Sequence, residues 1–100
     1  MGSAMNSGTG GGPGDEVTLR FWAAAREAAG LAEEASSERN LAAALAGSVR
    51  RRGGAGSALA GVLARCSFLV DGAPVGTREP AAVPLPPGAV VDVLPPFAGG

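Results

Sequence analysis

The chain has 100 residues and a net charge of −1, with eight arginines, nine acidic residues and neither lysine nor histidine. A chain of this length forms one small domain that buries only about 60% of its unfolded surface, which leaves little room for an enclosed catalytic pocket. The near-neutral charge argues against the broad basic surface that nucleic-acid binding needs. We therefore expect a small module that works with partner proteins.

Cysteine content and hydropathy bear on the compartment and on metal binding. Cys66 is the only cysteine, so no intramolecular disulfide can form and nothing in the sequence supports an oxidising compartment. No apolar run approaches the roughly 20 residues that span a bilayer, and no signal-peptide pattern is present. We expect a cytoplasmic protein. Without histidine, a second cysteine or clustered carboxylates, we expect no metal and no cofactor bound by this chain.

The chain begins with a polar segment and becomes regular from Asp15 onward. Residues 1–14 are mostly Gly, Ser, Thr, Asn and Pro, and we expect a disordered leader there, with residues 1–4 interpreted as a cloning remnant. Residues 17–21 alternate apolar and polar side chains, which predicts a half-buried strand. Residues 22–29 are rich in alanine and stop at Gly30, which predicts a short helix. A weak strand is expected over residues 33–37.

The main amphipathic helix is predicted to follow Asn40. The short side chain of Asn40 can accept a hydrogen bond from a free amide of the first turn, as an N-cap does. Arg50, Arg51 and Arg52 are expected in the last turn, where the macrodipole favours cations, and are interpreted as a solvated helix end before Gly53. The apolar residues of this helix recur at four-residue spacing: Leu41, Leu45 and Val49.

A second short helix, a hairpin and a final strand complete the pattern. Ser57 is a candidate cap for a helix that reaches residue 65, and residues 66–70 and 73–75 are expected to form a hairpin around Asp71-Gly72. The proline-rich segment 80–87 cannot form a regular central strand. Residues 89–94 are β-branched with one outward-facing Asp92, and predict the last strand.

The order strand, weak strand, helix, short helix, hairpin, strand predicts an α+β fold of the β-grasp, ubiquitin-like type, with one main helix across a mixed sheet. We expect this domain to occupy residues 15–94 and an extended tail to occupy residues 95–100. The first and last strands are expected to be parallel neighbours, a pairing that can place the chain end at the sheet's edge.

The tail is the most informative segment. Two prolines fix φ and stiffen the exit from the sheet, and terminal glycines without Cβ atoms can enter a narrow active-site channel. Glycine occupies 17 of 100 positions, so a Gly-Gly end alone is weak evidence; the stiff proline stem directly after a strand strengthens it. The segment reads Leu94, Pro95, Pro96, Phe97, Ala98, Gly99 and Gly100.

A terminal carboxylate becomes a useful electrophile only after activation. Oxide is a poor leaving group, and adenylation by ATP replaces it with a phosphate ester that a sulfur nucleophile can displace. The product is a C-terminal thiocarboxylate. The tail therefore predicts a sulfur carrier whose working group is the Gly100 carboxylate.

Three stretches resemble the small subunit of molybdopterin synthase, within the sulfur-carrier family that includes the thiamine-pathway carrier. They are residues 19–30, residues 63–72 and residues 91–100, and the Pro-Pro-x-x-Gly-Gly ending is the most specific of them. The resemblance implies that Gly100 is the adenylation and thiocarboxylate site, and that residues 94–99 form a partner-binding tail. It also implies delivery of sulfur to cyclic pyranopterin monophosphate in molybdenum cofactor biosynthesis.

The partners that the resemblance implies are the large catalytic subunit, an E1-like adenylating enzyme that uses ATP, and a sulfur-donating sulfurtransferase. This chain then donates sulfur, and the catalytic groups belong to the large subunit. Two alternatives stay open: a carrier for thiamine or cysteine synthesis, and a ubiquitin-like modifier conjugated through Gly100.

Other residues receive no functional role from the sequence. Cys66 is interpreted as a small buried hydrophobe, and Arg26-Glu27 as a surface pair. Trp22 and Phe21 are interpreted as core and rim side chains rather than as a binding platform.

Overall fold

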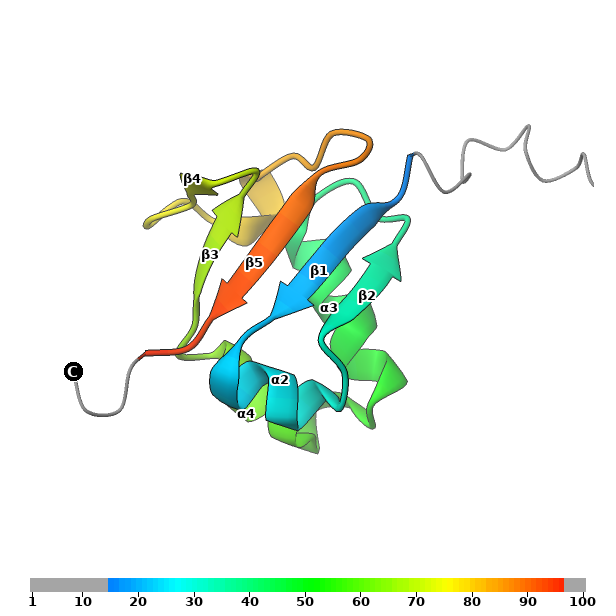
Figure 1. Ribbon diagram of the computed structural model, residues 1–100, viewed down its shortest axis with the longest axis vertical. Helices are drawn as coiled ribbons and strands as arrows, with labels where there is room; N and C mark the ends of the chain where they lie inside the picture. Colours follow the sequence, from blue (N-terminus) through cyan, green and yellow to red (C-terminus); the bar gives the residue numbers. More distant parts are fainter. Residues whose placement is uncertain (1–14, 97–100) are drawn as a thin grey trace, which may run out of the picture.

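A mixed five-stranded sheet, with its helices gathered on one face, forms the part of the chain that the computed structural model describes, residues 15–96 (Figure 1). The expected leader and residues 97–100 lie outside this part, so both stay predictions. The strands are β1 (Val17–Phe21), β2 (Glu33–Ser36), β3 (Ser67–Val70), β4 (Ala73–Pro74) and β5 (Val90–Leu94). The helices are α2 (Ala23–Ala29), α3 (Leu41–Arg51) and α4 (Ala58–Leu63), with 3-10 turns η1 (Gly54–Gly56) and η2 (Pro80–Ala82).

The sheet order is β2-β1-β5-β3-β4, which makes β5 the central strand. β1 and β5 are parallel neighbours, with Leu19 opposite Val91, and this prediction is confirmed. The expectation that the chain end lies at the sheet's edge is wrong, because β3 pairs antiparallel with the other side of β5. The chain instead leaves the sheet beyond the C-terminal end of its central strand (Figure 1).

Alternation along the strands separates the two faces of the sheet. On β1, Val17, Leu19 and Phe21 are buried, whereas the two residues between them are only half-buried. Burial of one such side chain contributes about 1.5 to 3 kcal/mol. The core therefore lies between the sheet and α3, whose residues Leu41 and Ala44 are fully buried.

Side-chain caps define the starts of two helices. The Oδ1 atom of Asn40 accepts a hydrogen bond from the amide of Ala43 at 2.9 Å, as predicted for the main helix. The Oγ atom of Ser57 accepts from the amide of Ala60 at 3.2 Å. Helix α4, which Ser57 caps, ends at Leu63, two residues earlier than predicted. Each cap satisfies an amide that has no partner within the helix.

The predicted hairpin turn is confirmed at Asp71-Gly72. Asp71 has φ of 50° and Gly72 has φ of 84°, and two positive values in succession define a type I′ turn. The return strand β4 has only two residues, one fewer than predicted. Beyond Pro74 the amide of Val75 still donates to the carbonyl of Phe68 at 2.9 Å, so backbone bonding to β3 continues one residue past the end of β4.

The proline-rich segment before β5 forms no strand of the sheet, as predicted, yet it contributes to the core. Val83 and Leu85 are almost completely buried. The amide of Leu41 donates to the carbonyl of Val83 at 3.0 Å, and the amide of Leu85 donates to that of Arg39 at 2.8 Å. These bonds attach the segment to the start of α3, a long-range role that its local composition does not reveal.

The interpretation of residues 50–52 as a solvated helix end is wrong for Arg52, whose side chain is only 17% exposed; Arg51 is 46% exposed, as expected, although it also pairs with Glu34. Arg51 Nε lies 3.0 Å from one carboxylate oxygen of Glu34, and Arg52 Nη1 lies 3.0 Å from the other. The Ser48 hydroxyl donates to the same carboxylate at 2.6 Å. Glu34 lies on β2 and faces α3, so its charge attracts cations that solvent would otherwise surround. Arg50 is exposed, as predicted.

Candidate functional site

The tail begins at the end of the central strand. Leu94 and Pro95 are half-buried and Pro96 is exposed. The pair Ser67–Leu94 is the last pair of the β3–β5 ladder. Pro95 follows Leu94 and has no N–H to extend the ladder. Pairing therefore ends where the predicted tail starts. Phe97, Ala98, Gly99 and Gly100 lie outside the described residues, so their assignment as the activated end stays a prediction.

Contrary to the prediction, Asp92 does not face solvent. It lies on the face of the sheet opposite the helices, yet it is only 7% exposed because two side chains from the neighbouring segment cover it. Arg20 donates to its two oxygens at 2.8 and 3.1 Å, and the indole Nε1 of Trp22 donates to Oδ1 at 2.8 Å. The parallel register places Arg20 directly opposite Asp92 and so creates this cluster.

The hydrogen bonds in this cluster shift the pKa values of Asp92 and Arg20. The hydrogen bonds from Arg20 hold the pKa of Asp92 below its usual range, and they outweigh burial, which acts in the opposite direction; Trp22 adds to the lowering. The same hydrogen bond raises the pKa of Arg20. Both groups are therefore charged at neutral pH.

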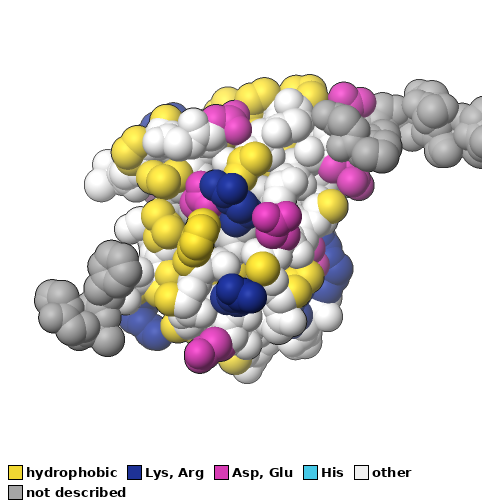
Figure 2. All heavy atoms as spheres, viewed as in Figure 1, with side chains coloured by type: hydrophobic (Ala, Val, Ile, Leu, Met, Phe, Trp, Pro, Cys, Tyr) yellow, Lys and Arg dark blue, Asp and Glu magenta, His cyan; other side chains and the backbone are white. Residues whose placement is uncertain are grey.

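Trp22 lies outside the core, whereas Phe21 is buried in it. Trp22 is 48% exposed and is the more exposed of two large apolar side chains on the described surface. Together with Ala23 it borders a small hollow whose other wall is Leu94 and Pro95. Figure 2 shows this side of the molecule, with apolar side chains gathered over β3 and the C-terminal half of β5. The base of the tail thus lies beside an apolar surface.

Cys66 precedes β3, at the same end of the sheet as the base of the tail. It is half-buried, and its Sγ donates to the carbonyl of Val62 at 3.3 Å. Burial raises the pKa of the Cys66 thiol, and the nearby charge of Arg65 offsets this only in part. A thiol with a raised pKa is a weak nucleophile at neutral pH. The packing role expected for Cys66 fits these contacts.

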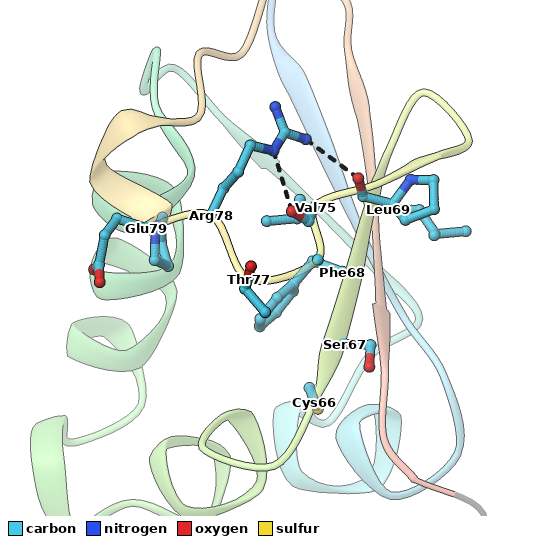
Figure 3. A pocket seen from close by; sticks show the side chains of 11 residues that line it. Cys66, Ser67, Phe68, Leu69, Val75, Thr77, Arg78 and Glu79 are labelled. Carbon is cyan, nitrogen blue, oxygen red and sulfur yellow. Dashed lines mark hydrogen bonds between the residues drawn. The ribbon is translucent and has the colours of Figure 1, made fainter.

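A second hollow lies between β3 and the loop after β4 (Figure 3). Its basic group is Arg78, whose Nε donates to the carbonyl of Val75 at 3.1 Å and whose Nη2 donates to that of Pro74 at 3.2 Å. Because these bonds hold the loop's own backbone, this arginine has a local structural role. We therefore place the candidate site at the base of the tail.

Residues 15–96 carry neither a metal-ligand cluster nor a helix that could cross a membrane. No group of three or more metal-ligating side chains comes together in this part. None of its helices combines the length and the hydropathy needed to cross a membrane. Arg26 and Glu27 are exposed on α2, and no ion pair joins them there.

Three solved structures share this fold. Small archaeal modifier protein 1 from Methanosarcina acetivorans has a TM-score of 0.71 and 23% identity, covering 89% of this chain and 100% of that one. The complex of subunits 1 and 2 of the molybdopterin-converting factor from Helicobacter pylori has a TM-score of 0.60 and 21% identity, covering 85% and 99%. The Haloferax volcanii HVO 2177 protein has a TM-score of 0.59 and 28% identity, covering 85% and 86%.

The family assignment comes from sequence. No curated protein matches this chain. A family model described as the ThiS family matches residues 19–100, which is most of the chain and includes the whole tail. The structural neighbours independently show the ubiquitin-like β-grasp fold. The chain therefore belongs to the ThiS family, the sulfur-carrier family that its sequence motifs resemble.

Proposed function

We propose that this chain is the sulfur-donating small subunit of a molybdopterin synthase. The observation that carries the proposal is the Pro95-Pro96 stem, which leaves the central strand directly and precedes a Gly-Gly end. The structural similarity to the complex of molybdopterin-converting factor subunits supports a large-subunit partner.

The chemistry proceeds in three steps. An E1-like enzyme joins the Gly100 carboxylate to the α-phosphate of ATP, with release of pyrophosphate, and forms an acyl adenylate. A sulfur nucleophile supplied through a sulfurtransferase attacks the acyl carbon, AMP leaves, and a thiocarboxylate results. The large subunit then receives the charged tail and transfers its sulfur to cyclic pyranopterin monophosphate. This chain supplies the donor atom and the docking face, and no cofactor of its own.

The chain's composition suits an activated C-terminus. It contains no lysine, so no lysine side chain of its own can attack the acyl adenylate. The Cys66 thiol, with its raised pKa and its hydrogen bond to Val62, is a poor competitor. Loss of the activated end to self-acylation is therefore limited.

Intact mass spectrometry tests the proposal. The chain is incubated with ATP, a candidate adenylating enzyme and a sulfur donor, and a Gly99-Gly100 deletion serves as the control. We expect a mass gain that matches the exchange of one oxygen for sulfur, absent from the control. No gain with several competent adenylating enzymes contradicts the carrier chemistry.

A modifier function is the second candidate, favoured by the structural similarity to a small archaeal modifier protein. Conjugation through Gly100 to lysines of other proteins predicts higher-mass adducts in cell extracts. Because the chain itself has no lysine, such adducts are expected to carry single copies rather than lysine-linked polymers. A carrier for thiamine or cysteine synthesis differs instead in the large partner that co-purifies with the charged chain.

A further inference from the structure

Asp92 is a buried carboxylate on the face of the sheet that the helices leave uncovered. Its side chain is only 10% exposed, whereas that of its partner Arg20 is 42% exposed. Burial of a charge is costly unless the charge is paired and hydrogen-bonded. The two hydrogen bonds from Arg20 offset that cost, so the ion pair by itself explains how the Asp92 carboxylate can be buried. It does not account for the third donor, Trp22.

Trp22 is 48% exposed, so an indole rotated away from Asp92 would donate its N–H to water instead. Its bond to Asp92 therefore matters for the orientation of the ring rather than for satisfying the N–H. A bond to an ionised acceptor is about twice as strong as a neutral one. Arg20 also lies over the ring, with its guanidinium carbon 5.9 Å from the ring centre. The backbone amide of Trp22 donates to the carbonyl of Val93 at 3.2 Å, which places the residue beside β5.

The fixed ring borders the base of the tail. Trp22 and Ala23 form one side of the hollow, and Leu94 and Pro95 form the other. Proline restricts φ, so the stem has few remaining degrees of freedom. The indole thus bounds the space on one side of Pro95.

We infer that Asp92 and Arg20 are positioning residues that hold the Trp22 ring as a fixed wall and so direct the Pro95-Pro96 stem as it leaves the sheet. The consequence for sulfur transfer rests on the proposed function. A stem already directed outward loses less conformational freedom when it enters an activating enzyme. This smaller loss of conformational freedom strengthens binding to the activating enzyme, so it lowers KM and leaves kcat unchanged.

Nuclear Overhauser effects test the geometry without any sulfur chemistry. Trp22 is the only tryptophan, so its ring protons are assigned without ambiguity. We expect cross-peaks between the Trp22 and Pro95 rings in the wild type and their loss in Asp92→Val, a residue that suits a strand. The control is Glu34→Gln, which disrupts a comparable ion pair between β2 and α3 and leaves the cross-peaks intact. Unchanged cross-peaks in Asp92→Val overturn the inference. If that variant fails to fold, Asp92→Ala, which also removes the carboxylate that accepts from Trp22, replaces it with the same expected outcomes.

Steady-state kinetics of C-terminal charging test the predicted effect of the stem's direction on binding to the activating enzyme. With the adenylating enzyme that charges the wild type, Asp92→Val and Trp22→Phe are expected to raise the KM for this chain about 3- to 10-fold and to leave kcat unchanged. Trp22→Phe keeps an aromatic ring but lacks the N–H. Glu34→Gln should leave KM unchanged despite its lower melting temperature. Equal KM values for all four proteins overturn a positioning role in charging. A wild type that no enzyme charges refutes the proposed function, and the cross-peaks then decide the positioning role by themselves.

Discussion

At the scale of single residues, Glu34 shows how one carboxylate joins β2 to the end of α3. Its side chain is 11% exposed and accepts hydrogen bonds from Ser48, Arg51 and Arg52. Burial by itself would raise the pKa of Glu34, but these three donors together lower it below its usual value. The Arg52 guanidinium also lies over Phe21 and donates to the carbonyl of Ala29 at 2.8 Å, so the ion pair extends to the core and to α2.

Replacement of Glu34 by glutamine should destabilise the fold by about 2 kcal/mol at neutral pH, because the half-buried Arg52 guanidinium loses its charged partner. The folded-state pKa is depressed, so the stabilisation is complete above the unfolded pKa of about 4.3 and is lost as pH falls through the folded value. Urea unfolding of both proteins at pH 7 and pH 3 checks this. A difference in unfolding free energy that does not shrink on acidification contradicts the assignment.

At the scale of elements, each segment starts or ends at a residue whose chemistry requires it. Asn40 caps α3, and the left-handed Gly30, with φ of 83°, ends α2 by donating its amide to the carbonyl of Arg26 at 2.9 Å. The β3–β4 hairpin turns on two residues with positive φ, of which Gly72 carries no Cβ penalty. These features act within a few residues, which is why the sequence predicted them.

Asn40→Ala removes the side-chain acceptor for the amide of Ala43. We expect a loss of about 1 kcal/mol in unfolding free energy, measured by chemical denaturation. Asn40→Ser is the matched control, since serine retains an acceptor at this position and should cost much less. Equal losses in the two variants would show that the cap bond does not account for the effect.

Gly72→Ala is expected to destabilise the fold by about 1 to 2 kcal/mol, because an L-residue at φ of 84° brings its Cβ close to the backbone. The space around the position is open, so the cost is conformational rather than steric packing. Gly61→Ala provides the comparison: that glycine lies in α4 with nothing near its Cβ position, and alanine there should stabilise by about 0.4 to 1 kcal/mol. Thermal unfolding measures both, and effects of the same sign contradict the argument.

At the scale of the whole molecule, the central position of β5 separates the fold from the tail. β5 is bonded on both sides, to β1 and to β3, and its residues Val91 and Val93 are fully buried. The strand is therefore among the most firmly held parts of the described chain. The tail starts only after this strand, so folding and tail chemistry use different residues.

Deletion of Gly99-Gly100 should consequently leave the melting temperature unchanged while it abolishes sulfur charging. Both glycines follow β5 in the sequence, and every residue of the described core precedes them. Differential scanning calorimetry and intact mass spectrometry on the same preparation check the two halves of this prediction. A large drop in melting temperature would mean that the tail is part of the folded domain.

Local patterns in the sequence predict the order and most of the bounds of the elements, the two helix caps, the hairpin turn and the family resemblance. Each rests on local rules: side-chain periodicity, a capping side chain, a positive φ, or a contiguous motif such as the tail. The tail was therefore recognisable without a structure, although the residues that surround its base were not.

Three features depend on long-range packing instead: the cluster of Asp92 with Arg20 and Trp22, the pairing of Arg52 with Glu34, and the burial of Val83 and Leu85 in the core. Arg20 and Asp92 are 72 positions apart and meet only because β1 and β5 pair in one parallel register. A shift of one residue would turn either side chain to the opposite face. Sequence periodicity says that a strand has two faces, but the pairing of distant strands decides which charges meet there and what lies beside the tail.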